Sequence, residues 1–95
     1  MQRFVVVTTD ERRKGVFGGV LVDWDPEARI AVLQEARMAI YWSKGVHGVL
    51  GLAAGGPDAN SRISPAVPRL ELDGVTAVID AAEAARENWE AEPWG

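Results

Sequence analysis

The feature of this sequence that most limits its fold is a series of short apolar segments, each ended by turn-forming residues. The first segment, residues 2–8, is rich in β-branched side chains, which favour extended strands. A polar turn over residues 9–15 separates it from the second segment, residues 16–24. The next turn, residues 25–28, contains Pro26, which cannot donate a hydrogen bond to a β-ladder. The pattern therefore predicts successive strands joined by turns.

Two adjacent glycines, Gly18 and Gly19, lie inside the second predicted strand. Glycine weakens the interior of a strand and often marks a β-bulge or a place where another part of the chain comes close. We therefore expect a bulge or a close backbone approach at this pair, within a strand and not within a helix.

The middle of the chain alternates in a way that indicates a third extended region. Met38, Ile40 and Trp42 alternate with less apolar or more polar neighbours, which is the period of a strand. We expect residues 30–33 and 37–42 to form one bent strand or two short ones. An amphipathic helix over the same region is the alternative.

A short helix is predicted over residues 46–54. Val46, Leu50 and Ala54 would lie on one face of it, and Gly55 would supply the C-terminal stop. Residues 57–61 then form a loop.

Two more strands are expected at residues 69–73 and 75–79, with Gly74 between them. The final helix is predicted to start with a capping box, in which Asp80 is the N-cap and Glu83 reaches back to it. Its apolar stripe consists of Ala82, Ala85 and Trp89. Pro93 ends the helix.

These elements predict an α+β, mostly β fold: a five- to six-stranded, largely antiparallel sheet or small barrel, with one short helix and a C-terminal acidic helix. The 95 residues are enough for a single domain, 1–95. Its β-rich body is expected over residues 1–79, and the C-terminal helix and tail over residues 80–95. Edge strands in so small a sheet favour pairing with a second copy, so a homo-oligomer is expected.

The charge pattern separates the body of the chain from its end. Up to residue 79 nine acidic residues are balanced by nine basic ones, whereas residues 80–95 hold five acids and one arginine, which accounts for the net charge of −4. Binding to duplex nucleic acid needs a basic face, and the composition provides none. We expect no duplex nucleic-acid partner.

Several other classes of protein are not expected from the sequence. It has no cysteine, and its first residues lack a signal-peptide core. It also has no apolar run of the roughly 20 residues that a membrane span needs. We expect a soluble cytoplasmic protein that contacts no membrane and has no metal site and no cofactor.

Signatures of enzymes are also weak. The glycines of residues 45–51 lack the Lys-Ser/Thr end of a P-loop and the spacing of a dinucleotide fingerprint. His47, the only histidine, can be combined on paper with Ser43 or Ser61 and an aspartate, but most sequences of this composition allow such a triad. We expect that the protein is not an enzyme and that it has no catalytic residues.

The adjacent rings of Tyr41 and Trp42 are the first candidates for binding. Neighbouring strand residues point to opposite faces, so one ring can enter the core while the other faces outward. Both rings can instead pack, one in the core and one under the C-terminal helix. An outward ring would offer a stacking surface for a base or a partner side chain. For Trp94, near the end of the chain, docking on the protein's own sheet is expected.

Arg62, flanked by Ser61 and the hydroxyl of Ser64, is the second candidate. A guanidinium group binds phosphate or carboxylate through two N–H groups, and the hydroxyls would complete the shell. The alternative is an ion pair between this arginine and Asp58. The predicted ligand-binding residues are Arg37, Tyr41, Trp42, Lys44, His47, Ser61 and Arg62. The hypothesis requires Arg37, Lys44 and Arg62 to converge beside one of the rings.

The most specific sequence blocks are Ala36-Arg37, Tyr41-Trp42 and Ser61-Arg62-Ile63-Ser64, in an order that spans residues 2–79. In these blocks the chain resembles an uncharacterised small domain family of bacteriophage and prophage proteins. The resemblance implies a viral origin and this architecture, but no activity. The resemblance also implies that this chain shares with the family a surface of unknown role, which comprises Arg37, Tyr41, Trp42, His47 and Arg62. The acidic helix after Asp80 is expected to be peculiar to this chain.

A viral origin favours small oligomeric binders that act against host defences. The first hypothesis is therefore sequestration of a nucleotide-like ligand, with arginines on its phosphates and a ring on its base. The alternative is a protein-interaction module or inhibitor of a host protein that acts through the acidic C-terminal helix, or a phage structural accessory.

Overall fold

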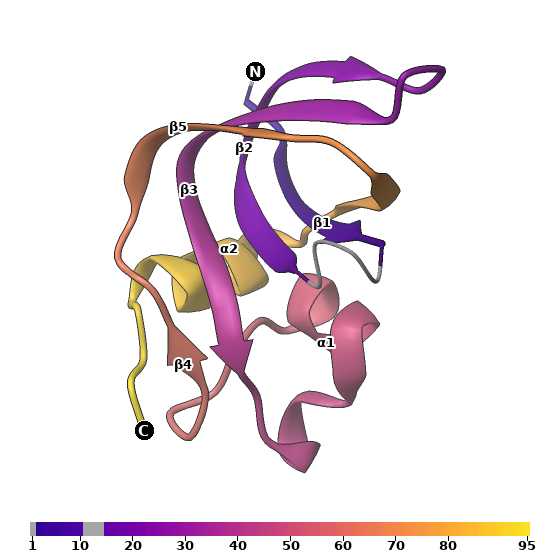
Figure 1. Cartoon of the computed structure of the whole chain (residues 1–95). Helices are drawn as coiled ribbons and strands as arrows, with labels where there is room; N and C mark the ends of the chain where they lie inside the picture. The colour runs from indigo at the N-terminus through magenta and orange to yellow at the C-terminus, as the bar shows by residue number, and fades with distance from the viewer. Residues whose placement is uncertain (1, 11–14) are drawn as a thin grey trace.

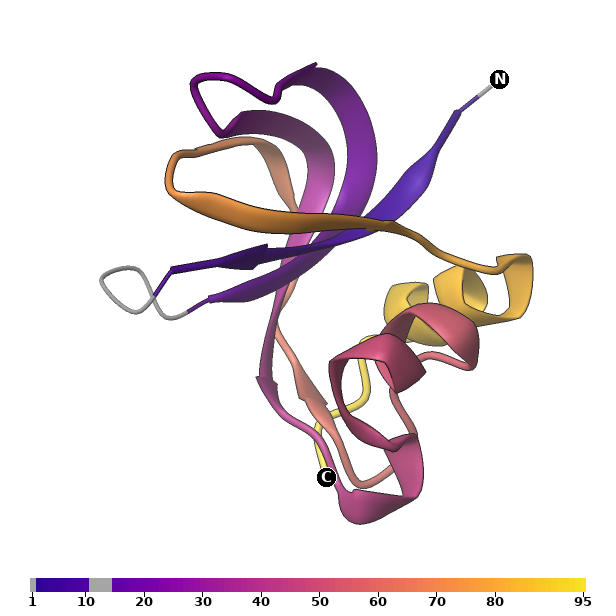
Figure 2. The same cartoon turned by 90° about the vertical axis from the view of Figure 1, so that its right-hand side faces the viewer.

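The computed structural model describes residues 2–10 and 15–95. It forms a six-stranded antiparallel sheet with two α-helices on one side (Figures 1 and 2). The elements are β1 (Phe4–Thr9), β2 (Val16–Asp25), β3 (Ile30–Tyr41), the 3₁₀ turn η1 (Lys44–Val46), α1 (Gly48–Ala54), β4 (Arg62–Ile63), β5 (Val67–Leu72), β6 (Val75–Asp80) and α2 (Glu83–Glu90). The predicted α+β, mostly β class is confirmed. The turn predicted at residues 9–15 lies partly outside the described residues, at 11–14.

The sheet is strongly curved but open. Its strand order is β4-β3-β2-β1-β6, and β5 pairs with the same edge of β3 that β4 uses further along. β5 and β6 therefore lie at opposite edges, although only Asp73 and Gly74 separate them in sequence. Gly74 has a φ of 64°, which glycine adopts readily. The described strands form no ladder between β5 and β6, so the predicted sheet is correct and its barrel alternative is not.

β1 is the central strand of the core. Its β-branched residues Val5, Val6 and Val7 are fully buried because both faces of the strand are covered. Phe4 and Val6 face a helix–sheet core, together with Val20, Ala39, Val46, Leu52, Ala53, Ile63 and Trp89. Val5 and Val7 face a sheet core on the other side, together with Ala31, Leu33, Ala36, Leu72 and Val75 among other residues.

The glycine pair in β2 behaves as predicted. The pairing of β2 with β3 shifts register between Gly18 and Val20, which is a bulge. A Cβ atom on Gly18 would lie 2.8 Å from ring carbons of Trp89, so the missing side chain makes room for the indole of α2. Both expectations for this pair, a bulge and a close approach, are confirmed.

β3 is one strand of 12 residues, which excludes the helical alternative. It pairs with β2 on one edge; on the other it pairs first with β5 and then with β4. Glu35, with a φ of 51°, lies at the bulge where the strand bends. The C-terminal end of β3 extends past β5 and lies beside β4 (Figure 1). Tyr41 is the last residue of this strand.

The short helix begins later than predicted, and the three residues predicted to share one face do not share one environment. Val46 is buried and lies in the turn before α1, whereas Leu50 and Ala54 are exposed. His47 has left-handed backbone angles (φ 68°, ψ 41°), which separate the η1 turn from α1. This break changes which side chains face the sheet. Leu52 and Ala53 are buried, whereas Leu50 is 69% exposed and Ala54 is exposed.

The predicted capping box is also wrong. Asp80 is the last residue of β6, where it pairs with Val5 and forms an ion pair with Arg3 (Nη2–Oδ1 2.9 Å). The helix starts at Glu83, and its N-cap, Ala82, makes no side-chain capping bond. Ala82 is exposed, but the other members of the predicted stripe, Ala85 and Trp89, are fully buried.

Candidate functional site

Two of the predicted binding residues meet at the far end of β3. Tyr41 pairs with Arg62 in the β3–β4 ladder, so their side chains leave adjacent strands at the same level. Together with Ile40, Asn60 and Gly95 they line a surface hollow of about 460 Å³. We call it the Tyr41–Arg62 hollow. Tyr41 is 53% exposed and Arg62 is exposed, so both residues are accessible from solvent.

The end of the chain closes one side of this hollow. The Arg62 Nε donates a hydrogen bond of 2.7 Å to the Gly95 carbonyl oxygen. The Arg62 guanidinium carbon also lies 5.7 Å from the centroid of the Trp94 ring, within the range of a cation–π contact. Trp94 thus docks on the protein's own sheet as expected, yet its side chain remains largely exposed.

Ser61, in contrast, points inward. It is fully buried, and its hydroxyl donates to Asp58 Oδ1 (3.0 Å) and accepts from the Asp58 backbone N–H (3.2 Å). The Ser43 hydroxyl donates to the other carboxylate oxygen of Asp58 at 2.6 Å. These contacts tie the segment after β3 to the segment before β4. The Asp58 carboxylate is engaged by these two hydroxyls. Arg62 contacts Gly95 and not Asp58, which was the alternative partner considered for it.

The same hydrogen bonds act on the carboxyl group of Asp58. The bond from Ser43 has the largest effect and the bond from Ser61 adds to it, and together they hold the pKa of Asp58 below its ordinary value of 3.8. The partial burial of the carboxylate acts in the opposite direction and is outweighed. Asp58 is therefore ionised at neutral pH and joins Ser43 to Ser61 through its carboxylate.

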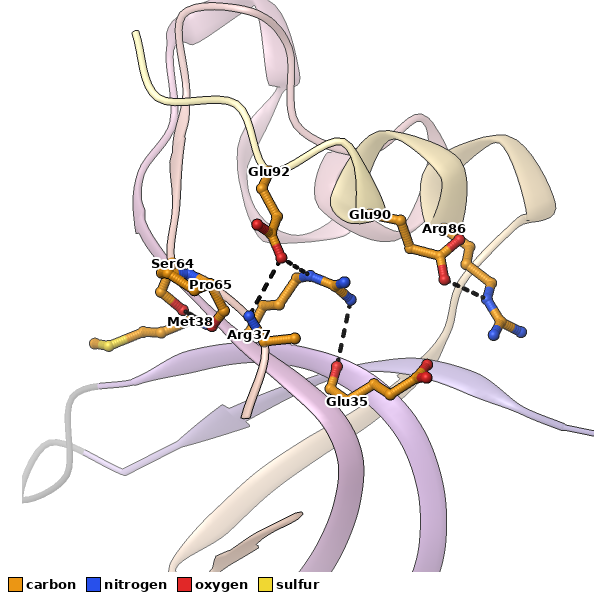
Figure 3. Close-up of polar contacts among 9 residues, drawn as sticks. Glu35, Arg37, Met38, Ser64, Pro65, Arg86, Glu90 and Glu92 are labelled. Atoms are coloured by element: carbon orange, nitrogen blue, oxygen red, sulfur yellow. Dashed lines mark hydrogen bonds and ion pairs between the residues drawn. The ribbon is translucent and has the colours of Figure 1, made fainter. Parts of the chain in front are cut away.

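Arg37 does not line the hollow. Its Nε donates to Glu92 Oε2 at 2.9 Å, and its Nη1 donates to the Glu35 carbonyl oxygen at 3.4 Å (Figure 3). Its side chain is only 11% exposed. Arg37 therefore holds the segment that follows α2, and its guanidinium group is not presented to solvent.

The remaining predicted residues lie elsewhere. Trp42 is half-buried against the helix–sheet core, and Lys44 is exposed at the start of η1. His47 is exposed and lines a second, larger hollow of about 810 Å³ between α1 and the loop over residues 55–59. The two adjacent rings thus differ, since Tyr41 faces outward and Trp42 packs.

The structure brings Tyr41 and Arg62 together but does not add the other five predicted residues to their hollow. Trp94 and Gly95 were missed as neighbours of Arg62. They meet Arg62 through an isolated β-bridge between residues 32 positions apart in the chain (94 minus 62). No local pattern in the sequence encodes such a long-range pairing. The only available signal was a tryptophan in a polar tail.

Two other features are absent from the residues that the structure describes. Within residues 2–10 and 15–95, no three His, Asp or Glu side chains come close enough to hold a metal ion. In the same part of the chain, neither helix has the length and apolar character needed to cross a membrane.

Comparison with known proteins gives a family but no activity. No curated protein and no solved structure matches the chain. A family model described as a domain of unknown function, DUF6948, matches residues 2–89. The match includes nearly all of α2, so the expectation that this helix is peculiar to the chain is wrong. The helix belongs to the domain because Trp89 fills its core. The expectation of an uncharacterised domain family is confirmed: the chain belongs to the DUF6948 family.

Proposed function

We propose that this protein is a non-enzymatic binding domain that holds a small nucleotide-like ligand in the Tyr41–Arg62 hollow. One observation carries the proposal: an exposed phenol ring and an exposed guanidinium group leave paired strands and line one concavity. A volume of about 460 Å³ lies within the range of roughly 300–1,000 Å³ that small-ligand sites occupy.

The two side chains supply complementary interactions. Stacking of a base on an aromatic ring contributes about 1–3 kcal/mol and tolerates different bases. A guanidinium group binds phosphate oxygens through charge-assisted hydrogen bonds, which are stronger than those between neutral groups. Asn60, also on the rim, offers an amide that can orient the ligand. The ligand would thus be a flat ring joined to an anionic group.

The geometry supports a smaller site than the sequence predicted. Arg37 is engaged with Glu92, and Ser61 is buried against Asp58, so neither is available to a ligand in this arrangement. A single arginine then holds the phosphate, and we expect modest affinity. A site of this kind suits sequestration of an abundant nucleotide messenger, which agrees with a phage-type protein that acts against host defences.

Calorimetric titration tests this proposal directly. The probes are AMP, cyclic AMP and ADP-ribose, with adenosine as the probe that lacks phosphate. We expect heat of binding for the phosphate-bearing probes and its loss in Arg62→Ala. Arg69→Ala is the matched control. It removes the same charge from an exposed position on β5 that pairs with Gln34, roughly 20 Å along β3 from Tyr41. Silence of the wild-type protein toward every probe at millimolar concentration would reject the proposal.

A second candidate function rests on the charge of α2. Glu83, Glu87 and Glu90 follow one another at helical spacing, and all three are exposed. Only Arg86 on this helix opposes them, through a contact with Glu90 of 3.4 Å. The stripe would suit a basic surface on a host protein.

Deletion of the whole helix does not test that candidate, because Trp89 is part of the core and its loss would unfold the domain. The sharper variant is Glu83→Gln/Glu87→Gln, with Glu27→Gln/Glu71→Gln as the control of equal charge change at exposed positions away from the helix. A host protein captured by the wild type is purified and then titrated with each variant. It should bind the Glu27→Gln/Glu71→Gln control normally and the Glu83→Gln/Glu87→Gln variant weakly. Equal affinities would remove this candidate.

We also propose that the protein forms a homo-oligomer through an edge of its sheet. β6 lies at one edge in the strand order and pairs only with β1 among the described strands. Its free edge can accept a strand from a second copy. Sedimentation equilibrium measures the subunit number, and a monomer at all concentrations would contradict this proposal.

A further inference from the structure

The segment that follows α2 runs back along the edge of β4. We call residues 91–95 the C-terminal strap. The Ile63 backbone N–H donates to the Pro93 carbonyl oxygen (2.8 Å), and the Gly95 N–H donates to the Ser61 carbonyl oxygen (3.0 Å). Between these bonds, Trp94 forms an antiparallel bridge with Arg62. The strap thus lies beside β4 and joins it through a single antiparallel bridge; Figure 1 shows the yellow end of the chain next to β4.

At Arg62 the strap makes the oxygen contact that the phosphate of a ligand would make, and it adds an aromatic ring that the proposed ligand would place on Tyr41 instead. The Gly95 carbonyl oxygen accepts the Nε hydrogen bond, and the Trp94 ring lies against the guanidinium group. An oxygen acceptor and an aromatic ring are also the two groups of the ligand in the proposed function. The strap therefore occupies part of the site with groups of the same chemistry.

The strap has one firm attachment and one weak one. Near its start, Glu92 has left-handed backbone angles (φ 48°), which are unfavourable for a residue with a side chain. The Glu92 carboxylate accepts from Arg37 Nε and from the Ala66 N–H (3.2 Å), and these bonds hold it there (Figure 3). At the far end, Trp94 is 62% exposed and Gly95 is exposed, so little apolar surface is buried there.

We infer that the C-terminal strap is an internal competitor for the Tyr41–Arg62 hollow, and that a ligand with an aromatic ring and an anionic oxygen binds by displacing Trp94 and Gly95 from Arg62. This inference rests on the proposed function and adds the mode of entry to it. A phosphate group presents several anionic oxygens to the Arg62 guanidinium group, where the strap presents one Gly95 oxygen to its Nε. Bonds to more than one N–H of the guanidinium group favour the exchange. The Arg37–Glu92 pair keeps the start of the strap in place while its end moves.

AMP affinity of a strap variant tests the competition. Trp94→Ala removes the ring that lies on Arg62 and should bind AMP about two- to fivefold more tightly than the wild type, the equivalent of one exposed cation–π contact. Leu50→Ala is the matched control, since Leu50 is a large exposed side chain that lines the other hollow. Its AMP affinity should equal that of the wild type. Unchanged thermal unfolding shows that both variants fold.

The outcomes separate the two proposals. If the wild type binds AMP and Trp94→Ala binds it equally or less tightly, the competition is overturned, while the proposed function stands. If neither protein binds AMP or any other probe nucleotide, the proposed function fails and the competition fails with it. If Trp94→Ala binds AMP more tightly than the wild type and Leu50→Ala does not, both the proposed function and the competition are supported.

The rate of amide hydrogen exchange where the strap lies beside β4 provides a second test, on the wild type and on one variant. Displacement of the strap breaks the bonds of the Ile63 and Gly95 N–H groups, so AMP should speed exchange at both amides. In the absence of ligand, Arg37→Gln should speed exchange at the same amides because it releases Glu92. Slower exchange at Ile63 and Gly95 with AMP bound would mean that the strap closes over the ligand, and it would overturn the inference.

Discussion

Trp89 and Trp94 are five residues apart, yet they occupy opposite kinds of environment. Trp89 is fully buried, its Nε1 donates to the Leu52 carbonyl oxygen at 3.0 Å, and its ring lies 6.3 Å from that of Phe4. Trp94 is largely exposed and its ring contacts a guanidinium group. The same residue type thus completes the core at one position and covers a candidate site at the other.

The difference separates a contact that holds the fold together from a contact made at the exposed surface. A buried indole whose N–H is satisfied excludes water and contributes large apolar area. An exposed indole on an arginine contributes little to stability, because solvent competes for both groups. We therefore expect substitutions around Trp89 to alter folding, and substitutions around Trp94 to alter binding.

The largest effect is expected from Trp89→Ala. Removal of the ring would leave a cavity between α2 and β2 and should lower the free energy of unfolding by about 3–5 kcal/mol. Chemical denaturation monitored by far-UV circular dichroism measures this loss. Trp94→Ala is the matched comparison and should cost less than about 1 kcal/mol. Similar losses in the two variants would break the distinction between the two tryptophans.

A smaller loss is expected from Gly18→Ala, which adds one carbon 2.8 Å from the Trp89 ring. Overpacking of this kind costs about 1–3 kcal/mol, because the ring or the strand must move. Gly55→Ala is the control, since its backbone is right-handed (φ −117°) and an added Cβ meets nothing within 4 Å. Denaturation should show a loss for the first variant only. An unchanged Gly18→Ala protein would mean that the ring adjusts without cost.

Asp58 should make the stability of the fold depend on acid. The pKa of Asp58 is lower in the folded chain than its ordinary value of 3.8, so the unfolded chain binds more protons in acid. The stabilisation by Asp58 is therefore complete above a pH of about 3.8 and is lost as the pH falls through the folded value. Unfolding measured from pH 6 to pH 2.5 should show a shallower acid decline for Asp58→Asn than for the wild type. Parallel declines would show that the bonds from Ser43 and Ser61 do not favour the carboxylate.

The smallest effect on stability is expected from Arg62→Ala. Arg62 is exposed, and substitutions at such positions usually change stability by less than about 0.5 kcal/mol. Arg37→Ala should lower the free energy of unfolding more than Arg62→Ala does. The Arg37 side chain is largely buried, and its removal takes the ion-pair partner from the Glu92 carboxylate. Thermal unfolding of both variants measures the difference. A larger loss for Arg62→Ala would show that the strap is a structural element and not a displaceable one.

The sequence was a good guide wherever local preference and tertiary packing agreed. The β-branched residues of β1 form a strand, and the glycines of β2 form a bulge, because each effect acts within a few residues. It was a poor guide where a distant partner decided the outcome. Asp80 fits a helix cap locally, but its pairing with β1 extends β6 and removes it from the helix.

The candidate site divides in the same way. That Tyr41 and Arg62 are chemically suited to binding was evident from their residue types and setting. That Arg37 binds Glu92 instead, and that Trp94 reaches Arg62, depended on where α2 ends and the chain turns back. Such contacts join residues 55 and 32 positions apart (92 minus 37, and 94 minus 62), and no local pattern records them.

By itself the sequence determined the class of the fold, five of its six strands and the acidic character of its end, since these follow from residue types and short-range spacing. Only the tertiary structure decided which tryptophan is buried, which of Arg37 and Arg62 is exposed and which hydroxyl points inward. The physical reason is that α2 packs against β2 with the Trp89 indole at Gly18, which buries this ring in the core. The position of α2 in turn sets where the C-terminal strap, with Trp94, begins.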